Sequence, residues 1–164
     1  MYEAKPQVEH EWLHKLIGEW VFAGRMEMGP GQPQEESTGA ERFTGLGDFW
    51  VRSEGHGTTP DGVPATWSFT LGYDPRREKY VGTWLGSMMP HMFVYEGARD
   101  PSGAVLTLDA EGPAMDDDNK TARYQDIVEF VDDDHWVLRS QMLGEDGTWM
   151  QFMTTDYRRA TTAD

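Results

Sequence analysis

The sequence predicts an all-β fold, an up-and-down antiparallel barrel of about ten strands with a short N-terminal helix. Three observations lead to this prediction. From Glu19 onward, apolar and polar residues alternate, and turn residues interrupt the alternation about every ten positions. From Trp67 onward every connection is short, which favours hairpins over crossovers. Glycines inside strands, such as Gly45, Gly72 and Gly82, fit the sharp bending that barrel closure requires.

The opening helix is expected at residues 8–17. Apolar residues recur there at helical spacing and would form one stripe: Val8, Trp12, Leu13, Leu16 and Ile17. Gly18 follows, at a place where a helix commonly ends on glycine. We expect this helix to plug or flank one end of the barrel.

The barrel is expected over residues 19–158 of a single domain that spans residues 1–164. Its strands are predicted at 19–28, 36–46, 48–57, 64–73, 79–87, 91–99, 104–111, 121–131, 135–143 and 148–158. Asp100-Pro101-Ser102-Gly103 has the residue order of a type I turn, and Asp146-Gly147 is a pair typical of tight hairpins. These turn sequences support an antiparallel meander, in which each strand pairs with the next one in the chain.

Composition excludes several classes of site and partner. The 164 residues include no cysteine, which excludes disulfides, cysteine–zinc sites and thiol nucleophiles. The formal charge of −15 would repel nucleic-acid phosphates and anionic membranes, so neither partner is expected. The N-terminal segment has neither a basic start nor an apolar run, and no apolar run approaches the ~20 residues of a membrane span. A cytoplasmic location is therefore expected.

Several segments together resemble a known family. EHEWLHKLIGEW, GLGDFWVRSEG, PDGVPATWSFTLGYDP, KYVGTWLGSMMPHMFVYEG, LTLDAEGP, ARYQDIVEFVDDDH and DGTWMQFMTTDYRR occur in this order along nearly the whole chain. They resemble a bacterial domain-of-unknown-function family, number 1579. The resemblance implies a lipocalin-like (calycin-type) barrel and no particular reaction. The short helix followed by G-x-W is also distantly similar to nitrobindin-like haem barrels, which is an analogy of fold.

The segment from Trp67 to Gly97 holds the densest cluster of aromatic and methionine side chains. Aromatic residues beside strand glycines form either a packed core or a slot for a planar ligand, and a barrel of this size can hold one small molecule. The residues predicted to bind a ligand are Trp67, Trp84, Met89, His91, Phe93, Tyr95 and Arg139. Arg139 is included because a ligand carboxylate would be a natural partner if its side chain faced inward.

His91 is the most versatile of these residues. It could bind haem iron, bind another metal or act as a general base, or it could simply bond a backbone carbonyl at a strand start. Because side chains alternate along a strand, His91, Phe93 and Tyr95 share one face, and Met92, Val94 and Glu96 share the other. The ligand hypotheses require the first set to face inward, and the sequence leaves this open.

Residues His10-Glu11-Trp12-Leu13-His14 spell the H-E-x-x-H pattern of zinc proteases on a predicted helix. The two histidines lie at or beyond the edge of the apolar stripe, and Glu11 lies nearly opposite its centre, so we interpret the match as a coincidence. The prediction contains no metal site and no catalytic residue.

The leading hypothesis is a barrel that binds a small apolar or planar molecule inside, without catalysis and without a cofactor. Three alternatives remain open. The first is a haem barrel with His91 as axial ligand. The second is an enzyme that acts through His91 with Tyr95, and the third is an interaction module that forms a homodimer through exposed tryptophan and methionine rows.

Overall fold

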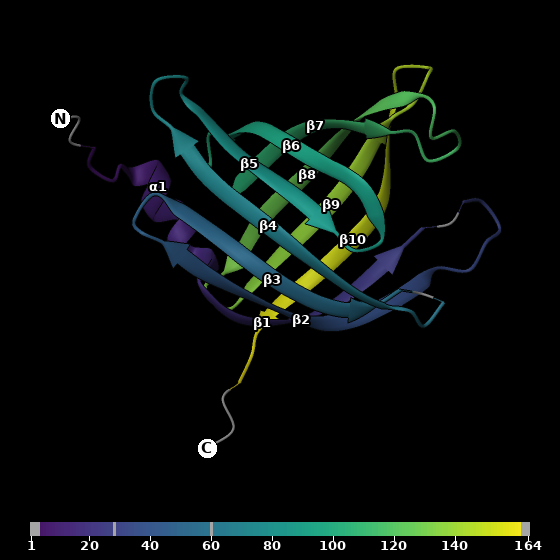
Figure 1. Cartoon of the computed structure of the whole chain (residues 1–164), viewed down its shortest axis with the longest axis horizontal. Helices are drawn as coiled ribbons and strands as arrows, with labels where there is room; N and C mark the ends of the chain where they lie inside the picture. Colours follow the sequence, from purple (N-terminus) through teal and green to yellow (C-terminus); the bar gives the residue numbers. More distant parts are fainter. Residues whose placement is uncertain (1–3, 28, 60, 162–164) are drawn as a thin grey trace.

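Ten antiparallel strands close into one barrel in a computed structural model of the chain, which describes residues 4–27, 29–59 and 61–161 (Figure 1). Each strand pairs with its neighbours in sequence, and β1 (Gly18–Met26) also pairs with β10 (Trp149–Arg159). Phe22 on β1 therefore lies between Gly39 on one side and Tyr157 on the other. Because the ring closes, every described strand pairs with a neighbour on both sides over at least part of its length, which reduces the aggregation hazard of a sheet edge.

All ten predicted strands form, which confirms the all-β prediction. The remaining strands are β2 (Glu35–Leu46), β3 (Trp50–Thr58), β4 (Pro64–Asp74), β5 (Lys79–Gly86), β6 (Met89–Arg99), β7 (Val105–Pro113), β8 (Thr121–Asp132) and β9 (His135–Leu143). Their bounds differ from the predicted ones by two residues or fewer. Residue 28, the predicted end of the first strand, lies outside the described residues.

The N-terminal helix is shorter than predicted. It consists of α1 (Val8–Leu13) and a 3-10 turn, η1 (His14–Leu16), after which β1 begins at Gly18 with a positive φ of 134°. Trp12 is buried, and its indole N–H donates to the main-chain oxygen of Gly103 at 2.6 Å. Its ring lies edge-on to Tyr80 and Phe130. The helix thus closes the barrel end at which it lies, on the left in Figure 1.

The two ends of the barrel are therefore different. We call the end at α1 the helix end. The opposite end carries the connections at residues 27–34, 59–63, 87–88, 114–120 and 144–148, and we call it the loop end. Neither helical segment in the described part of the chain has the length and apolar character that a membrane crossing requires.

Aromatic side chains fill the barrel toward the helix end. Trp136 stacks on Tyr157 with 3.9 Å between ring centroids, and Trp20 and Phe43 meet Trp136 edge-on. Large buried rings of this kind contribute most of the apolar area that stabilises a core. Phe69 stacks on Tyr95 in the same cluster.

Candidate functional site

The orientation of β6 determines which predicted residues reach the interior. Tyr95 is 2% exposed, whereas Val94 beside it is 62% exposed and Met92 is also exposed. His91 and Phe93 are partly buried on the same face as Tyr95. The face that the ligand hypotheses require therefore points into the barrel.

The hypothesis that exposed tryptophan and methionine side chains form a homodimer interface remains a prediction.

Toward the loop end, the interior is lined by aromatic rings, of which Tyr124 is buried and the others are partly buried. Phe93 meets Trp84 at 6.2 Å and Tyr124 at 5.5 Å between ring centroids. Tyr124 in turn meets Phe152 at 6.1 Å. We call Trp67, Trp84, Phe93, Tyr124 and Phe152 the aromatic rim. Met89 lies beyond it, exposed at the start of β6.

His91 bridges β6 and β7 where their pairing stops. The two strands pair only over Glu96–Arg99 of β6, and nearer the loop end the Nε2–H of His91 donates to the main-chain oxygen of Glu111 at 3.0 Å. The edge of Phe93 lies against the His91 ring, with 4.7 Å between centroids. In this structure His91 bonds a backbone carbonyl through Nε2, as one of the sequence-based alternatives expected. The haem alternative remains a prediction.

Two acidic side chains whose carboxyl groups are buried face the interior, and the sequence analysis did not single out either. Glu41 on β2 accepts hydrogen bonds at Oε1 from the Trp67 indole (2.9 Å) and the Tyr157 hydroxyl (2.8 Å). Asp126 on β8 accepts from Tyr95 at Oδ2 and, at 2.5 Å, from Ser140 at Oδ1. Each carboxyl is thus held by one tyrosine and one further donor. Tyr95 bonds Asp126 and not His91, so the proposed enzymatic pair is not joined by a hydrogen bond.

Burial controls the protonation of this interior cluster. It raises the pKa of Glu41 above the ordinary glutamate value, and the nearby hydroxyl of Ser53 and the hydrogen bonds from Trp67 and Tyr157 offset only part of that effect. Burial raises the pKa of Asp126 in the same way. The pKa values of Tyr95 and Tyr157 lie well above the ordinary range, first because both are buried and also because carboxyl groups face them. Both tyrosines therefore keep their protons and act as donors.

The two carboxyl groups differ in how completely they are satisfied. Both oxygens of Asp126 have partners. Glu41 is 2% exposed, and its Oε2 has no hydrogen-bond partner among the described residues. The indole nitrogen of Trp136 likewise has none. Buried polar atoms without a partner are uncommon and costly, so Glu41 requires an explanation.

Arg139 lies outside this cluster. It is on the outer face of β9, where its guanidinium donates to Glu129 on β8 at 2.6 Å. Its neighbours Leu138 and Ser140 are buried on the opposite face, because alternate side chains point to opposite faces, and Arg139 is only partly buried. The structure thus places Arg139 away from the interior, and we leave it out of the candidate site.

The H-E-x-x-H histidines have structural roles. Nδ1 of buried His10 accepts from the main-chain N–H of Gln7 at 2.9 Å, and its Nε2–H donates to the main-chain oxygen of Tyr73 at 3.0 Å. The Nε2–H of His14 donates to the main-chain oxygen of Asp48. Within the described residues, no group of three or more His, Asp or Glu is placed to hold a metal ion.

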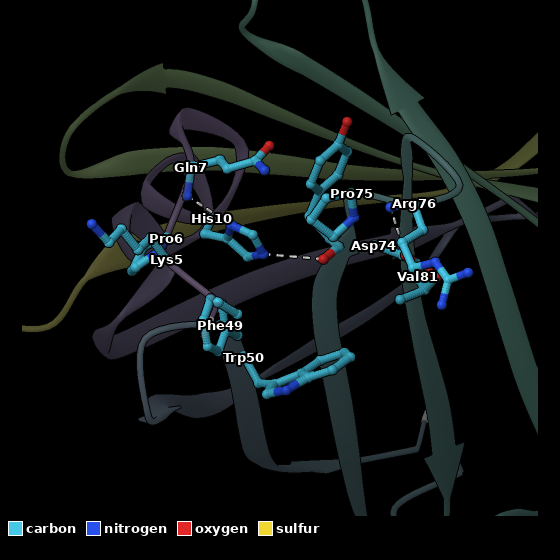
Figure 2. Close-up of a pocket in the computed structure, with 12 residues that line it drawn as sticks. Lys5, Pro6, Gln7, His10, Phe49, Trp50, Asp74, Pro75, Arg76 and Val81 are labelled. Atoms are coloured by element: carbon cyan, nitrogen blue, oxygen red, sulfur yellow. Dashed lines mark hydrogen bonds between the residues drawn. The ribbon is translucent and has the colours of Figure 1, made fainter. Parts of the chain in front are cut away.

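A groove of about 720 Å³ lies at the helix end, beside His10, and is drawn in Figure 2. Phe49 and Trp50 line one side, and Asp74, Pro75 and Arg76 line the other. None of the residues that the sequence predicts to bind a ligand lines this groove. It is therefore separate from the aromatic rim.

Comparison with known proteins identifies the family. The model of the family described as "Protein of unknown function (DUF1579)" matches residues 5–159, so the chain belongs to that family, as the sequence resemblance indicated. No curated protein matches the chain.

Solved structures show the same fold at low sequence identity. Rv2717c from M. tuberculosis is 15% identical with a TM-score of 0.65, covering 96% of this chain and 100% of its own. The S-type phycobiliprotein lyase CPES from Guillardia theta is 15% identical with a TM-score of 0.62 and the same coverage. EF1p2_mFAP2b, solved bound to DFHBI, is 15% identical with a TM-score of 0.50, covering 93% of this chain and 99% of its own.

Proposed function

We propose that this protein binds a small planar, largely apolar molecule inside the barrel, and that the molecule enters from the loop end. The observation that carries the proposal is the aromatic rim, in which Trp67, Trp84 and Phe93 pack against the core and yet keep part of their surface exposed. Partly exposed aromatic rings offer stacking and edge contacts that a flat ligand can complete. The helix closes the other end, so the rim is the natural approach.

The structural neighbours support this proposal by analogy of fold. One of them is solved bound to the small molecule DFHBI, and another is a phycobiliprotein lyase. The fold alone does not name a ligand, so the rim geometry remains the stronger argument.

The first test is native against denaturing mass spectrometry of freshly purified protein, with titration of a neutral planar probe, naphthalene-2-carboxamide, followed by tryptophan fluorescence. We expect either a carried molecule that dissociates on denaturation or saturable binding of the probe. Trp84→Ala and Phe93→Ala should each weaken the probe's binding about 2- to 10-fold, because one aromatic contact contributes ~0.5–1.5 kcal/mol.

The matched controls are Leu85→Ala and Val94→Ala, which remove exposed apolar side chains beside the two rim residues on the outer face. Their affinity for the probe should equal that of the wild type. The proposal is wrong if the purified protein carries nothing and the probe does not saturate. It is also wrong if the outer-face variants weaken binding as much as the rim variants do.

A further inference from the structure

The inner face of the barrel carries acidic side chains away from the helix end and arginines only at the helix end. Among the described residues on this face, the acidic side chains are Glu35, Glu41 and Asp126, and the arginines are Arg99 and Arg159. Arg99 lies over the Trp12 and Tyr80 rings, and Arg159 lies over Trp20 and bonds main-chain oxygens of the last helical turn. Neither arginine is available to a ligand that enters from the loop end.

Glu41 is the buried acceptor with unused capacity, and among the described residues the Trp136 indole nitrogen is the buried side-chain donor without a partner. Its Oε1 already accepts two hydrogen bonds, but its Oε2 accepts none, although the side chain is almost fully buried. Asp126 provides an internal comparison, since both its oxygens are occupied. A donor brought by a ligand would therefore find a free acceptor at Glu41 and not at Asp126.

Glu41 is also connected to the aromatic rim. Of the two residues that bond its Oε1, Tyr157 is buried and Trp67 is only partly buried. The Trp67 ring lies against Gly55, where an added Cβ would be 2.2 Å from the indole. A ligand that stacks within the rim is thus one side chain away from the free carboxyl oxygen.

We propose that Glu41 anchors a planar ligand that carries an N–H donor, such as an amidine, an amine or an amide, and that planar carboxylates are rejected. This inference rests on the proposed function and assigns its ligand class. A planar carboxylate would place a second negative charge beside a buried acid, with no cation to compensate. From the sequence we expected Arg139 to bind a ligand carboxylate. Here the polarity is the reverse: the ligand presents a hydrogen-bond donor, and an acidic side chain of the protein accepts the hydrogen bond.

The test uses three probes of the same shape: 2-naphthamidine (cationic donor), naphthalene-2-carboxamide (donor and acceptor) and 2-naphthoate (anionic acceptor). Binding is measured by calorimetry at about 0.3 M salt, which screens the long-range effect of the net charge. We expect the wild type to prefer the amidine over the naphthoate by about tenfold to hundredfold, the range of one charge-assisted hydrogen bond.

Glu41→Gln should reverse the contribution of this site, because the amide NH2 replaces the free acceptor with a donor. We expect the amidine to lose about tenfold or more, the naphthoate to gain affinity, and the carboxamide, which can turn either way, to change little. Glu36→Gln removes the same charge from an exposed position on the same strand and should change nothing, and Asp126→Asn should preserve the order of the three probes.

The outcomes separate this inference from the proposed function. If the carboxamide binds but the naphthoate binds as well as the amidine, the assignment to Glu41 is wrong and the binding function stands. The same holds if Glu41→Gln leaves the order unchanged. If none of the three probes binds, both proposals are wrong. The wild-type order decides the question by itself if the Glu41→Gln protein does not fold.

Discussion

If Glu41 serves ligand binding, its unpartnered buried carboxyl oxygen should lower the free energy of unfolding of the ligand-free protein. The substitution Glu41→Gln tests this directly. Glutamine retains the oxygen that accepts from Trp67 and Tyr157 and replaces only the unpartnered Oε2. The amide NH2 that takes its place is also left without a partner, but an unpartnered neutral group costs about 1–3 kcal/mol to bury and an unpartnered charge costs more. We therefore expect Glu41→Gln to be more stable than the wild type by about 1–3 kcal/mol at pH 8.

The pH dependence of this difference follows from the raised pKa of Glu41. An unfolded glutamate titrates near 4.5, and burial moves the folded pKa above that value. Below the unfolded pKa both states are protonated, so the carboxyl does not penalise folding. As pH rises from the unfolded pKa through the folded pKa, the free energy of unfolding falls, by about 1.4 kcal/mol for each pKa unit between the two states, and above the folded pKa it levels off. The advantage of Glu41→Gln should therefore be absent near pH 4 and present at pH 8.

The assay is urea unfolding followed by tryptophan fluorescence at several pH values, supported by thermal unfolding. For a chain of 164 residues, each kcal/mol corresponds to about 2–4 °C in Tm, so the variant should melt several degrees higher at pH 8. Glu36→Gln controls for the loss of an exposed charge and should stay within about 0.5 kcal/mol of the wild type. A Glu41→Gln protein that is no more stable at pH 8, or whose advantage does not change with pH, would refute the reasoning.

Two further predictions concern the fold. Gly82→Ala places a Cβ 2.1 Å from the main-chain oxygen of Thr70. We expect the free energy of unfolding, measured in urea, to fall by about 1–3 kcal/mol or more. An unchanged stability would show that β4 can move aside. Replacement of His10 by alanine removes two hydrogen bonds to the main chain from a buried site and should cost about 2–3 kcal/mol, whereas added zinc should leave the wild-type Tm unchanged. A zinc-dependent rise in Tm would instead favour a metal role for His10.

The strands were predictable because their signal is local. Alternation and turn residues such as Asp100 to Gly103 are short-range features, and the hydrogen bonds of the Asp100 side chain to Ser102 and Gly103 confirm that turn. The helix was overestimated by about one turn. Leu16 continues the apolar stripe, but the chain must leave the helix there to start β1, and the stripe alone does not record this constraint.

The site was only half predictable. Alternation shows which residues share a face, but it does not say which face is inner when both are apolar, as on β6. Arg139 was placed in the site although it lies on the outer wall. The sequence around it did not show which of the two faces of its strand points into the barrel. An available signal was missed on β2 and β8, where Glu41 shares a face with Phe43 and Asp126 shares one with Val128.

The sequence by itself determined the number of strands, their order and the aromatic character of the interior, because these follow from residue patterns within a few positions of each other. Only the tertiary structure decided the polarity of the site. The hydroxyl of Tyr157 reaches Glu41 across 116 residues of chain, and that contact exists only because β10 returns to pair with β1. Barrel closure encloses both carboxyl groups, raises the pKa of each and leaves one oxygen of Glu41 without a partner.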